Sequence, residues 1–541
     1  MDIPRLPLPG RCDARQRLLP WQAIFLLCIT AIILYAFVFG NFFWRTFLIS
    51  CWIALYTFNN LYRYWLAGES VWWRRMDARR IPLDPPLQGG ISPDGSTAVG
   101  AHGDAPLPDD ELPAYTILLP LRHEADVAGQ LMSAVNALDY PRHKLQVLCL
   151  LRRDDAETLA AIEAAARKQN ISVVIPADAR IQEMVREKST FSIPSECAGF
   201  AHWISACPTR GCAGMTNTEC TGNSLQFAVL FLPEDLPVGT KPAACNWGLA
   251  HATGEILVIY DAEDIPDSHQ LRDAAALLKT LPDDVAGVQS AKKVYNGNIN
   301  WLTRLYELEA LTWHHLQLPG VMAYEKLAPL HGSGVHLRTK VLLAMNGWDY
   351  YNVAEDCDLG VRLHRYGYRL VSFASITGEE APATFRGWVG QRTRWNKGYI
   401  QSFLVHFRNP IQLYRELSFR RTLSFVALTG ITWLNLLIGL PTWIGALMWG
   451  GIYQFHKSTF SDGVIPNTPL EMLLLIGSAI VLLLMAALLQ VAGAVAMRQW
   501  KLLPYGLLAP FYWILLGIAV WRSLWQLCIS PFGWEKTMHG N

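Results

Sequence analysis

Three carboxylates stand close together directly after a short apolar run. Asp261, Glu263 and Asp264 follow residues 255–260. Carboxylate oxygens are the ligands that Mg²⁺ and Mn²⁺ prefer, and such ions are usually held by one or two carboxylates together with substrate phosphates. The pattern therefore predicts a divalent-metal site that binds a nucleotide diphosphate. The alternative is an acidic turn that caps a helix starting near Asp267, which explains Asp264 better than Asp261.

Carboxylates also follow two earlier apolar runs. Asp154 and Asp155 come after residues 145–151, and Glu124 comes after residues 115–120. In doubly wound sheets the ligand binds at the carboxyl ends of the strands. Three strand ends that carry carboxylates are hard to explain as solvated loops alone, so we expect these residues to face one ligand.

Two further clusters stand downstream. Asp356, next to Glu355, suits a base that accepts a proton from an attacking hydroxyl group in a partly desolvated pocket. Gln391 precedes Arg394 and Trp395, where an arginine can clamp a pyrophosphate and an indole can stack on a sugar. The alternative for this last cluster is an Arg and Trp anchor at a membrane interface. The residues alone do not separate these two interpretations.

The composition excludes several classes of protein. Hydrophobic residues make up 51% of the 541 residues, the mean hydropathy is +0.17 and there are 21 Trp, which is more than a soluble core needs. The 46 Lys and Arg against 45 Asp and Glu leave a charge of +1, which disfavours a nucleic-acid binder. Eleven Cys over this length are too few for a disulfide scaffold. Membrane spans are therefore expected.

The N-terminal part predicts a helical hairpin. After a cytoplasmic stretch at 1–20, the uncharged runs 21–40 and 46–61 predict two transmembrane helices within 21–65, since about 20 helical residues cross a bilayer. A cleaved signal peptide is the rival for the first run, but no small-residue cleavage site follows it and a second apolar run comes at once. Residues 66–113 are expected to be a linker, because most of them are rich in Pro, Gly and Asp.

Three further uncharged runs predict a C-terminal transmembrane region over 422–530, with three or more spans and a tail at 531–541. The runs lie at 422–455, 472–497 and 502–521. Arginines flank the spans on the side of the long middle section, which the positive-inside rule assigns to the cytoplasm. Three spans would put the C-terminus outside, unless the first run is divided at Pro441. The sequence leaves this open.

Between residues 114 and 418, short apolar runs alternate with helical patterns. Such alternation predicts an α/β domain with a mainly parallel, Rossmann-like sheet. Strands are expected at 115–120, 145–151, 171–176 and 255–260, and helices at 126–138, 156–168 and 242–252. Residues 180–223 break the pattern as an insertion with Cys197, Cys207, Cys212 and Cys220, read as a loop with free thiols or, alternatively, as a structural zinc site.

The acidic and Arg-Trp clusters resemble a known family. In order, they are similar to the D, DxD, TED and QxxRW elements of family 2 inverting glycosyltransferases of the cellulose and hyaluronan synthase type, over about 115–410 and the flanking spans. Residues 241–246, 347–349 and 531–540 are similar to the branch that contains the bacterial phage-adsorption protein B. There are two departures from the family pattern. Glu263 replaces the second Asp of DxD, and Ala354 replaces the Thr of TED.

The resemblance implies a GT-A-like fold and a role for each matched residue. The donor-binding residues would be Glu124, Asp154, Asp155, Lys241, Gln391 and Arg394. The metal, Mg²⁺ or Mn²⁺, would be held by Asp261 and Glu263, with Asp264 able to share the role. Asp356 would be the general base with Glu355 beside it, and Trp395 would hold the terminal sugar of the acceptor.

The function implied is that of an inverting, processive hexosyltransferase in the bacterial inner membrane, with its catalytic domain in the cytoplasm. It would move sugar from a nucleotide-diphosphate sugar, with a UDP-sugar favoured, onto a growing surface polysaccharide, coupled to translocation across the bilayer and open to an export or outer-membrane partner. One rival is transfer of a single sugar to a polyprenyl phosphate or another lipid. A second rival is a catalytically silent scaffold subunit of an export complex, against which the retention of every acidic element argues. The sequence identifies neither the sugar nor the linkage.

Overall fold

The computed structural model describes most of the chain. The described residues are 22, 28, 31, 42–77, 107–169, 171–175, 225–234, 236, 239–323, 327, 329–441, 444, 469–533 and 535. Five predictions therefore lie wholly or largely outside the described residues: the cytoplasmic stretch 1–20, the first predicted span, the linker, the insertion with its four cysteines, and the tail 531–541.

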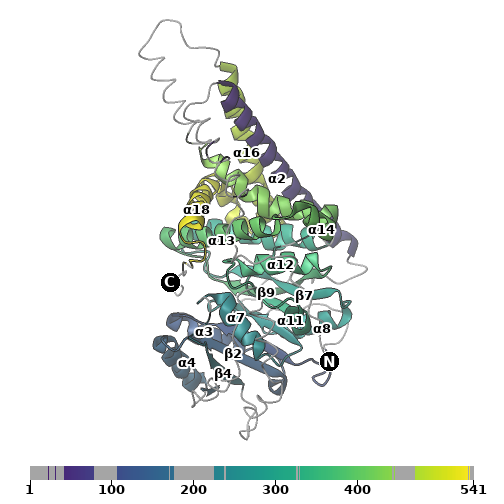
Figure 1. Ribbon diagram of the computed structural model, residues 1–541, viewed down its shortest axis with the longest axis vertical. Coiled ribbons are helices and arrows are strands. Elements are labelled where there is room, and N and C mark those ends of the chain that lie inside the picture. Colours follow the sequence, from purple (N-terminus) through teal and green to yellow (C-terminus); the bar gives the residue numbers. More distant parts are fainter. Residues whose placement is uncertain are drawn as a thin grey trace.

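A nine-stranded mixed sheet forms the centre of the lower part of the molecule (Figure 1), with the strand order β3-β4-β2-β1-β5-β8-β7-β9-β6. The strands are β1 (Tyr115–Pro120), β2 (Leu145–Leu151), β3 (Ser172–Val174), β4 (Gln226–Phe231), β5 (Ile256–Ile259), β6 (Ile265–Pro266), β7 (Val285–Val294), β8 (Val335–Arg338) and β9 (Arg369–Glu379). The five strands from β3 to β5 are parallel. Beyond them, β8 is antiparallel to both neighbours, β7 and β9 are parallel, and β6 is antiparallel to β9. The predicted α/β class is confirmed, and the antiparallel strands come in addition.

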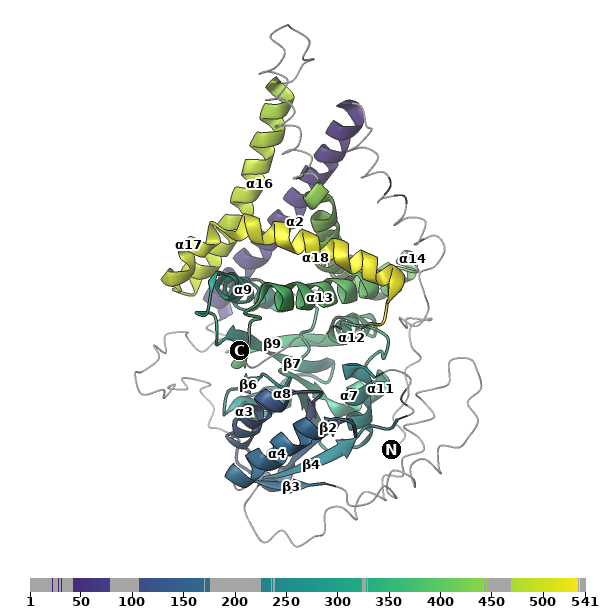
Figure 2. The same ribbon diagram turned by 90° about the vertical axis from the view of Figure 1, so that its left-hand side faces the viewer.

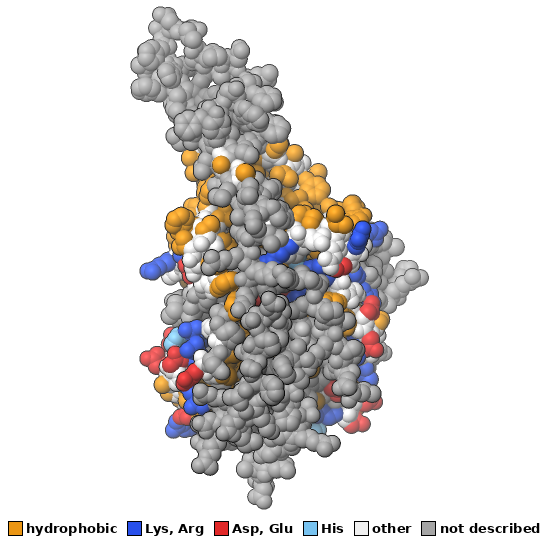
Figure 3. All heavy atoms as spheres, viewed as in Figure 1, with side chains coloured by type: hydrophobic (Ala, Val, Ile, Leu, Met, Phe, Trp, Pro, Cys, Tyr) orange, Lys and Arg blue, Asp and Glu red, His pale blue; other side chains and the backbone are white. Residues whose placement is uncertain are grey.

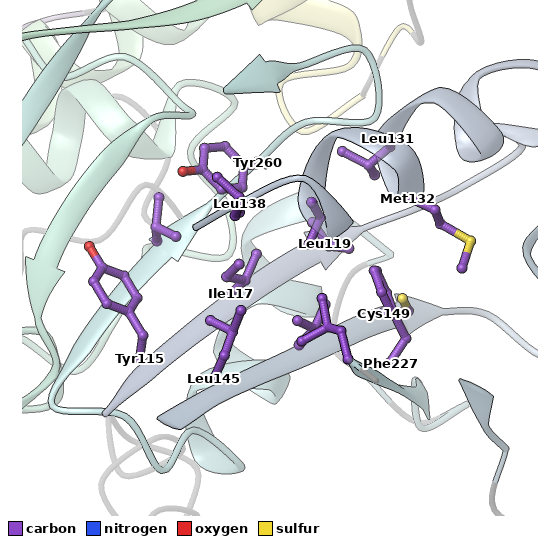
Figure 4. Close-up of a cluster of buried hydrophobic side chains, with 14 of the residues drawn as sticks. Tyr115, Ile117, Leu119, Leu131, Met132, Leu138, Leu145, Cys149, Phe227 and Tyr260 are labelled. Carbon is purple, nitrogen blue, oxygen red and sulfur yellow. The ribbon is translucent and has the colours of Figure 1, made fainter. Parts of the chain in front are cut away.

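Side chains alternate across the sheet and build one core on each face. Ile117 and Leu119 of β1 pack with α3 (Ala125–Asn136), α4 (Ala156–Gln169) and α8 (Gln270–Thr280). Figure 4 shows this cluster, with Leu131 and Met132 of α3 above β1. Leu118, between them, points to the other face. That face is covered by α7 (Lys241–Ala250), α11 (Thr339–Ala344) and α12 (Glu355–Arg365).

The remaining helices form a layer above the sheet and a bundle beyond it (Figure 2). The layer next to the sheet contains α9 (Trp301–Thr312) and α13 (Phe385–His406), and α18 (Ala509–Ile529) packs on the far side of α13. Beyond these helices, α2 (Phe42–Asp77) and α16 (Pro469–Ala496) rise side by side. The other short elements are η1 (Arg142–Lys144), η3 (Trp313–Gln317), α10 (Leu318–Ala323), α14 (Pro410–Phe425), η4 (Val426–Ile431), η5 (Trp500–Leu502) and α17 (Leu503–Gly506). Because α2 continues to Asp77, the start of the predicted linker is helical.

Two helices in the described part of the chain are long and apolar enough to cross a membrane. They are Pro410–Pro441 and Ala509–Ile529, and the corresponding apolar stretch of α16 is shorter, Leu483–Ala496. Hydrophobic side chains gather on the upper part of the molecule, over the helical region (Figure 3). The prediction of three or more C-terminal spans is not confirmed by these helices.

Candidate active site

A cavity of about 590 Å³ opens at the carboxyl ends of β1, β2 and β5. Its walls come from the loops after these strands, from the start of α7 and from α13. The sequence-predicted residues that line it are Glu124, Asp154, Lys241, Asp261, Glu263 and Arg394. The parallel strands bring them together, because the carboxyl ends of neighbouring parallel strands meet at one edge of a sheet. A cavity of this size is typical of small-molecule sites.

Asp261 and Lys241, which both line this cavity, form an ion pair. The Lys241 ammonium donates a hydrogen bond to Asp261 Oδ1 and lies 3.4 Å from the carbonyl oxygen of Gly332. Burial alone would raise the pKa of Asp261, but the charges of Lys241 and Lys292 outweigh it and hold the pKa below its usual value. Burial would lower the pKa of Lys241, yet the nearby carboxylates keep it raised. Both groups are therefore charged at neutral pH.

Glu263 and Asp264 differ in what they face. Asp264 is 1% exposed, its Oδ2 accepts from the Asp261 backbone N–H at 2.7 Å, and its Oδ1 accepts from Lys292 at 2.8 Å. Both of its oxygens are thus used inside the protein. Glu263 lines the cavity instead, and burial followed by the charges of Asp261 and Asp264 raises its pKa well above the usual value.

The acidic residues could hold a divalent cation only if a bound phosphate group and water supplied the remaining metal ligands. A cation beside Glu263 would favour the ionised form of this buried carboxylate, whose pKa is raised by burial and by the neighbouring acidic groups. Asp261 is already ionised, so the two residues together offer a suitable pair of oxygen donors. Among the described residues no group of three or more His, Cys, Asp or Glu side chains is arranged to hold a metal. The remaining ligands would therefore come from phosphate oxygens and water, as Mg²⁺ commonly accepts.

Asp356 of α12 lies close to the ion pair of Lys241 and Asp261, beside Gly332. It lies in the first turn of that helix, where its Oδ1 accepts from the Cys357 N–H at 2.8 Å. A Cβ placed on Gly332 would stand 3.2 Å from Lys241 Nζ, 3.5 Å from Asp356 Oδ2 and 4.0 Å from Asp261 Oδ2. Three charged side chains from different elements thus converge around a residue that has no side chain.

Burial shifts the acid–base properties of the α12 carboxylates. Burial, with the charge of Asp261 as a smaller contribution, raises the pKa of Asp356 above its usual value. Burial also raises the pKa of Glu355 to about 7, although Lys241 opposes the shift. Carboxylates that titrate closer to neutral pH are suited to accept a proton from a hydroxyl group.

The loop before α12 is clamped against α13. Asn352 Nδ2 donates to Ser402 Oγ at 3.0 Å, and Gln401 Oε1 accepts from the Val353 N–H at 3.2 Å. Ala354 packs so closely on Gly398 that a Cβ at Gly398 would lie 2.3 Å from the Ala354 Cβ. The residue that departs from the family's Thr is therefore a contact between α12 and α13.

Asp154 and Asp155 point in different directions. Asp155 is 3% exposed, and it accepts hydrogen bonds from the His123 N–H at 2.5 Å and the Thr158 N–H at 3.2 Å. Burial opposes ionisation, but these bonds hold its pKa below the usual value. Asp155 thus ties the first turn of α4 to the loop after β1 and is not among the cavity-lining residues. Asp154 lines the cavity and pairs with Arg152 at 3.2 Å.

On α13, the three predicted residues have different surroundings. Arg394 lines the cavity, whereas Gln391 and Trp395 are not among its lining residues. The Trp395 ring packs on the Arg392 guanidinium, whose carbon lies 4.7 Å from the ring centroid, and its centroid is 6.3 Å from that of Tyr306. Trp395 therefore belongs, in this structure, to an aromatic cluster around Arg392.

Sequence reasoning missed Lys292, Gly332 and Arg392. Lys292 lies on β7, is 5% exposed and bonds Asp264 and Ser333. A lysine inside a strand gives no signal of a buried ion pair, because its partner is distant in sequence. The glycines on either side of Ser333 were the available signal for a close approach, and Gly334 does adopt a φ of +67°.

Comparisons with known proteins identify glycosyltransferases among those similar to this chain. Residues 256–516 match the family model described as glycosyl transferase family group 2. The probable glycosyltransferase YdaM of Bacillus subtilis is 31% identical over 172 residues, which cover 31% of this chain and 40% of that protein. The beta-monoglucosyldiacylglycerol synthase of Trichormus variabilis is 27% identical over 173 residues, covering 31% and 36%. The probable glucomannan 4-beta-mannosyltransferase 11 of Oryza sativa is 26% identical over 240 residues, covering 40% of each chain.

The chain spans well under half the length of these curated relatives. Among solved structures, the mannosyltransferase PcManGT from Pyrobaculum calidifontis, in complex with GDP-Man and Mn²⁺, is similar with 17% identity and a TM-score of 0.49, over 88% of this chain and 99% of that chain. The matched family model and these curated relatives are all described as glycosyltransferases or glycolipid synthases. The region that matches the family model, residues 256–516, contains the DxD-like, TED-like and QxxRW elements and is thus similar to family 2 glycosyltransferases.

Proposed function

We propose that this protein transfers a hexosyl group from a nucleotide-diphosphate sugar, with a UDP-sugar favoured, to an acceptor hydroxyl group with inversion at the anomeric carbon. The observation that carries the proposal is the convergence of Lys241, Asp261 and Asp356 around Gly332, beside a cavity of nucleotide-sugar size. Lys241 supplies a positive charge, Asp261 a candidate metal ligand and Asp356 a base. A single displacement requires these groups close to one another.

The donor occupies the cavity in this proposal. Glu124 and Asp154 lie at the ends of β1 and β2, where their carboxylates can accept hydrogen bonds from the base and ribose. Arg394 and Lys241 supply positive charge for the diphosphate. Asp155 contributes indirectly, because it fixes the loop that carries Glu124.

Asp261 and Glu263 would hold the divalent cation, Mg²⁺ or Mn²⁺. The ion would neutralise the charge that develops on the leaving diphosphate. Lys241 remains beside Asp261 and keeps that carboxylate ionised. Asp264 supports the loop through Lys292 and takes no ligand role in this proposal.

Asp356 acts as the base. The acceptor hydroxyl gives its proton to the Asp356 carboxylate while its oxygen bonds to the anomeric carbon. The bond from that carbon to the diphosphate oxygen breaks, and the nucleoside diphosphate leaves with the electron pair. A single displacement of this kind inverts the anomeric centre and needs no covalent intermediate on the enzyme.

We propose a polysaccharide as the acceptor, extended processively at the bacterial inner membrane and coupled to translocation. The order of motifs and the C-terminal segment similar to the phage-adsorption protein B branch support this choice. The relatives also include a synthase named for a diacylglycerol glycolipid, so transfer of a single sugar to a lipid is the second candidate. Two long apolar helices favour either membrane-linked acceptor over a soluble one.

Transfer assays on the full chain in lipid nanodiscs test these proposals. Radiolabelled UDP- and GDP-sugars are supplied with Mg²⁺, Mn²⁺ or a chelator, and products are divided into polymer, lipid-extractable material and free sugar. Polymer supports processive synthesis, and lipid-extractable product with no polymer supports the second candidate. Absence of turnover with every donor would favour the silent scaffold.

Gly332→Ala provides a sharp variant for this assay. Its new methyl group would stand between Lys241 and Asp356, at 3.2 Å and 3.5 Å from their polar atoms, so we expect at least a tenfold loss of transfer with the fold retained. Gly68→Ala is the matched control, because nothing lies within 4 Å of its Cβ position. Equal activity of the two variants would show that the position around Gly332 takes no part in the reaction.

A further inference from the structure

Helix α18 passes the length and hydropathy test for a membrane span, yet it packs against a helix of the catalytic domain. In its first turn, Tyr512 Oη accepts from Trp388 Nε1 at 3.0 Å and from Arg392 Nη2 at 2.9 Å. Near its other end, Ser523 Oγ donates to the Thr393 carbonyl at 2.8 Å. All three partners lie on α13, which also brings Arg394 to the cavity. Figure 2 shows α18 lying across the direction in which α2 and α16 rise.

The chain that follows α18 returns directly to the catalytic domain. Lys397 donates to the Gly533 carbonyl, and Gln401 Nε2 donates to the Pro531 carbonyl at 2.9 Å. The Phe532 ring meets the Tyr351 ring, with centroids 5.2 Å apart, just before the loop that carries Asp356. The C-terminal end of α18 therefore lies on the same side as the candidate active site.

The chain that precedes α18 lies on that side as well. Leu502 packs with Leu308 of α9, and a Cβ on Gly493 would meet Thr312 of the same helix. α9 follows β7 of the sheet, so it belongs to the catalytic domain. A 21-residue helix is about 31 Å long, which is close to the thickness of a bilayer core. If α18 crossed a bilayer, its two ends would lie on opposite sides.

The outer face of α18 is an apolar stripe. Phe511, Ile518, Trp525 and Ile529 are 65%, 41%, 66% and 62% exposed, and their spacing of seven, seven and four places them on one helix face. The opposite face is buried through Tyr512, Leu516, Ala519, Val520 and Ser523. Exposed apolar side chains also occur on the segments that precede α18, at Leu484, Leu488, Val495, Trp500 and Leu507.

We propose that α18 lies along the membrane surface and does not cross the bilayer, with the stripe seated in the headgroup and acyl-chain boundary of the cytoplasmic leaflet. This inference rests on the proposed membrane location. A helix that is apolar on one face and bonded to protein on the other suits this position, and tryptophan is favoured there. If α18 is not a span, the predicted spans 422–455 and 472–497 cross the bilayer twice after the cytoplasmic catalytic domain. The chain after them is then in the cytoplasm again. The parity problem in the sequence is then resolved, with a cytoplasmic C-terminus.

A side-of-membrane experiment on the full chain tests the orientation. One variant carries a site-specific protease sequence inserted after Gln499, which is exposed between α16 and α18, and another carries it after Asn541. In sealed inside-out vesicles, we expect added protease to cut both, and in right-side-out vesicles neither. Cleavage of the two sites from opposite faces would overturn the inference.

Carbonate extraction of the same vesicles tests whether the protein is membrane-embedded at all. It therefore distinguishes a wrong orientation of α18 from a wrong membrane location. Protein stripped from the vesicles would remove the membrane setting and with it the inference, whereas the hexosyl-transfer assay would still report on the chemistry.

A lysine scan tests contact of the stripe with lipid. We expect Phe511→Lys, Ile518→Lys and Ile529→Lys to lower the amount of membrane-bound protein by less than about threefold each, because lysines at the boundary reach water. A crossing helix would place Ile518 alone near the bilayer centre, where a charge costs enough to reduce insertion by more than tenfold. Leu516→Lys, on the buried face, is the control for loss of folding, and its amount of membrane-bound protein should be lower than that of all three other variants. A selective collapse at Ile518 would contradict the surface position.

Discussion

At the residue scale, the site depends on carboxylates whose neighbours give them different tasks. Asp261 is kept ionised by Lys241, whereas Asp356 and Glu355 have raised pKa values because they are buried. We expect Asp356→Asn to lower transfer by about 10² to 10⁴, because an amide keeps the shape but cannot accept the acceptor's proton. Nucleotide affinity, measured by calorimetry, should change little. Wild-type turnover in this variant would remove Asp356 from the role of base.

Glu355 provides a test through pH. Its pKa of about 7 exceeds that of an unfolded glutamate, so between these values the folded state binds more protons, and stability falls as pH rises. Glu355→Gln removes this ionisation penalty. At pH 8 we expect the free energy of unfolding of the variant to exceed that of wild type by on the order of 2 kcal/mol, and at pH 5 the two should differ much less. Denaturant unfolding at both pH values measures this. An equal difference at both pH values would contradict the shifted pKa.

At the element scale, the position of Asp356 depends on how closely α12 approaches α13. A Cβ on Gly398 would lie 2.3 Å from the Ala354 Cβ and 2.5 Å from the Ala354 backbone N. We expect Gly398→Ala to push the start of α12 away, with a loss of about 1–3 kcal/mol in stability and a drop in transfer per folded molecule. Gly390→Ala on the same helix is the control, since its nearest contact is the end of the Glu535 side chain at 3.4 Å. Comparable turnover in the two alanine variants would show that this contact does not position the base.

At the scale of the whole molecule, a buried charge cluster joins the sheet domain to the outer helices. Arg392 of α13 bonds Glu309 of α9 and Tyr512 of α18, and its guanidinium carbon lies 4.7 Å from the ring centroids of both Tyr306 and Trp395. We expect Glu309→Ala to destabilise the protein by about 2 kcal/mol, because the variant leaves the buried Arg392 charge without its carboxylate partner. The loss is moderate because Glu309 is partly exposed, so solvent already weakens the attraction between the two charges. Thermal unfolding of purified protein measures this.

Glu307→Ala is the matched control on the same helix, since its pair with Arg304 joins neighbouring turns of α9 and holds no other element. If both glutamate variants melt alike, the cluster does not hold α9, α13 and α18 together.

The sequence by itself predicted the α/β class and the gathering of carboxylates at the strand ends. The runs at 115–120 and 145–151 coincide with β1 and β2, because continuous apolar runs of strand length bounded by turn residues leave few alternatives. The carboxylates after β1, β2 and β5 share one cavity because parallel strands end at a common edge. β4 and the antiparallel β8 were not predicted, since their pairing partners are far away along the chain.

Only the tertiary structure decided which carboxylate of each adjacent pair faces the cavity. Asp155 and Asp264 are turned inward by hydrogen bonds to His123 and Lys292, which lie about 30 residues away in sequence, and this leaves Asp154 and Glu263 at the surface of the cavity. The orientation of α18 has the same origin. Its apolarity permits a span, but its bonds to α13 hold it beside the catalytic domain. Composition reports how apolar a segment is, whereas direction is set by partners that only folding brings together.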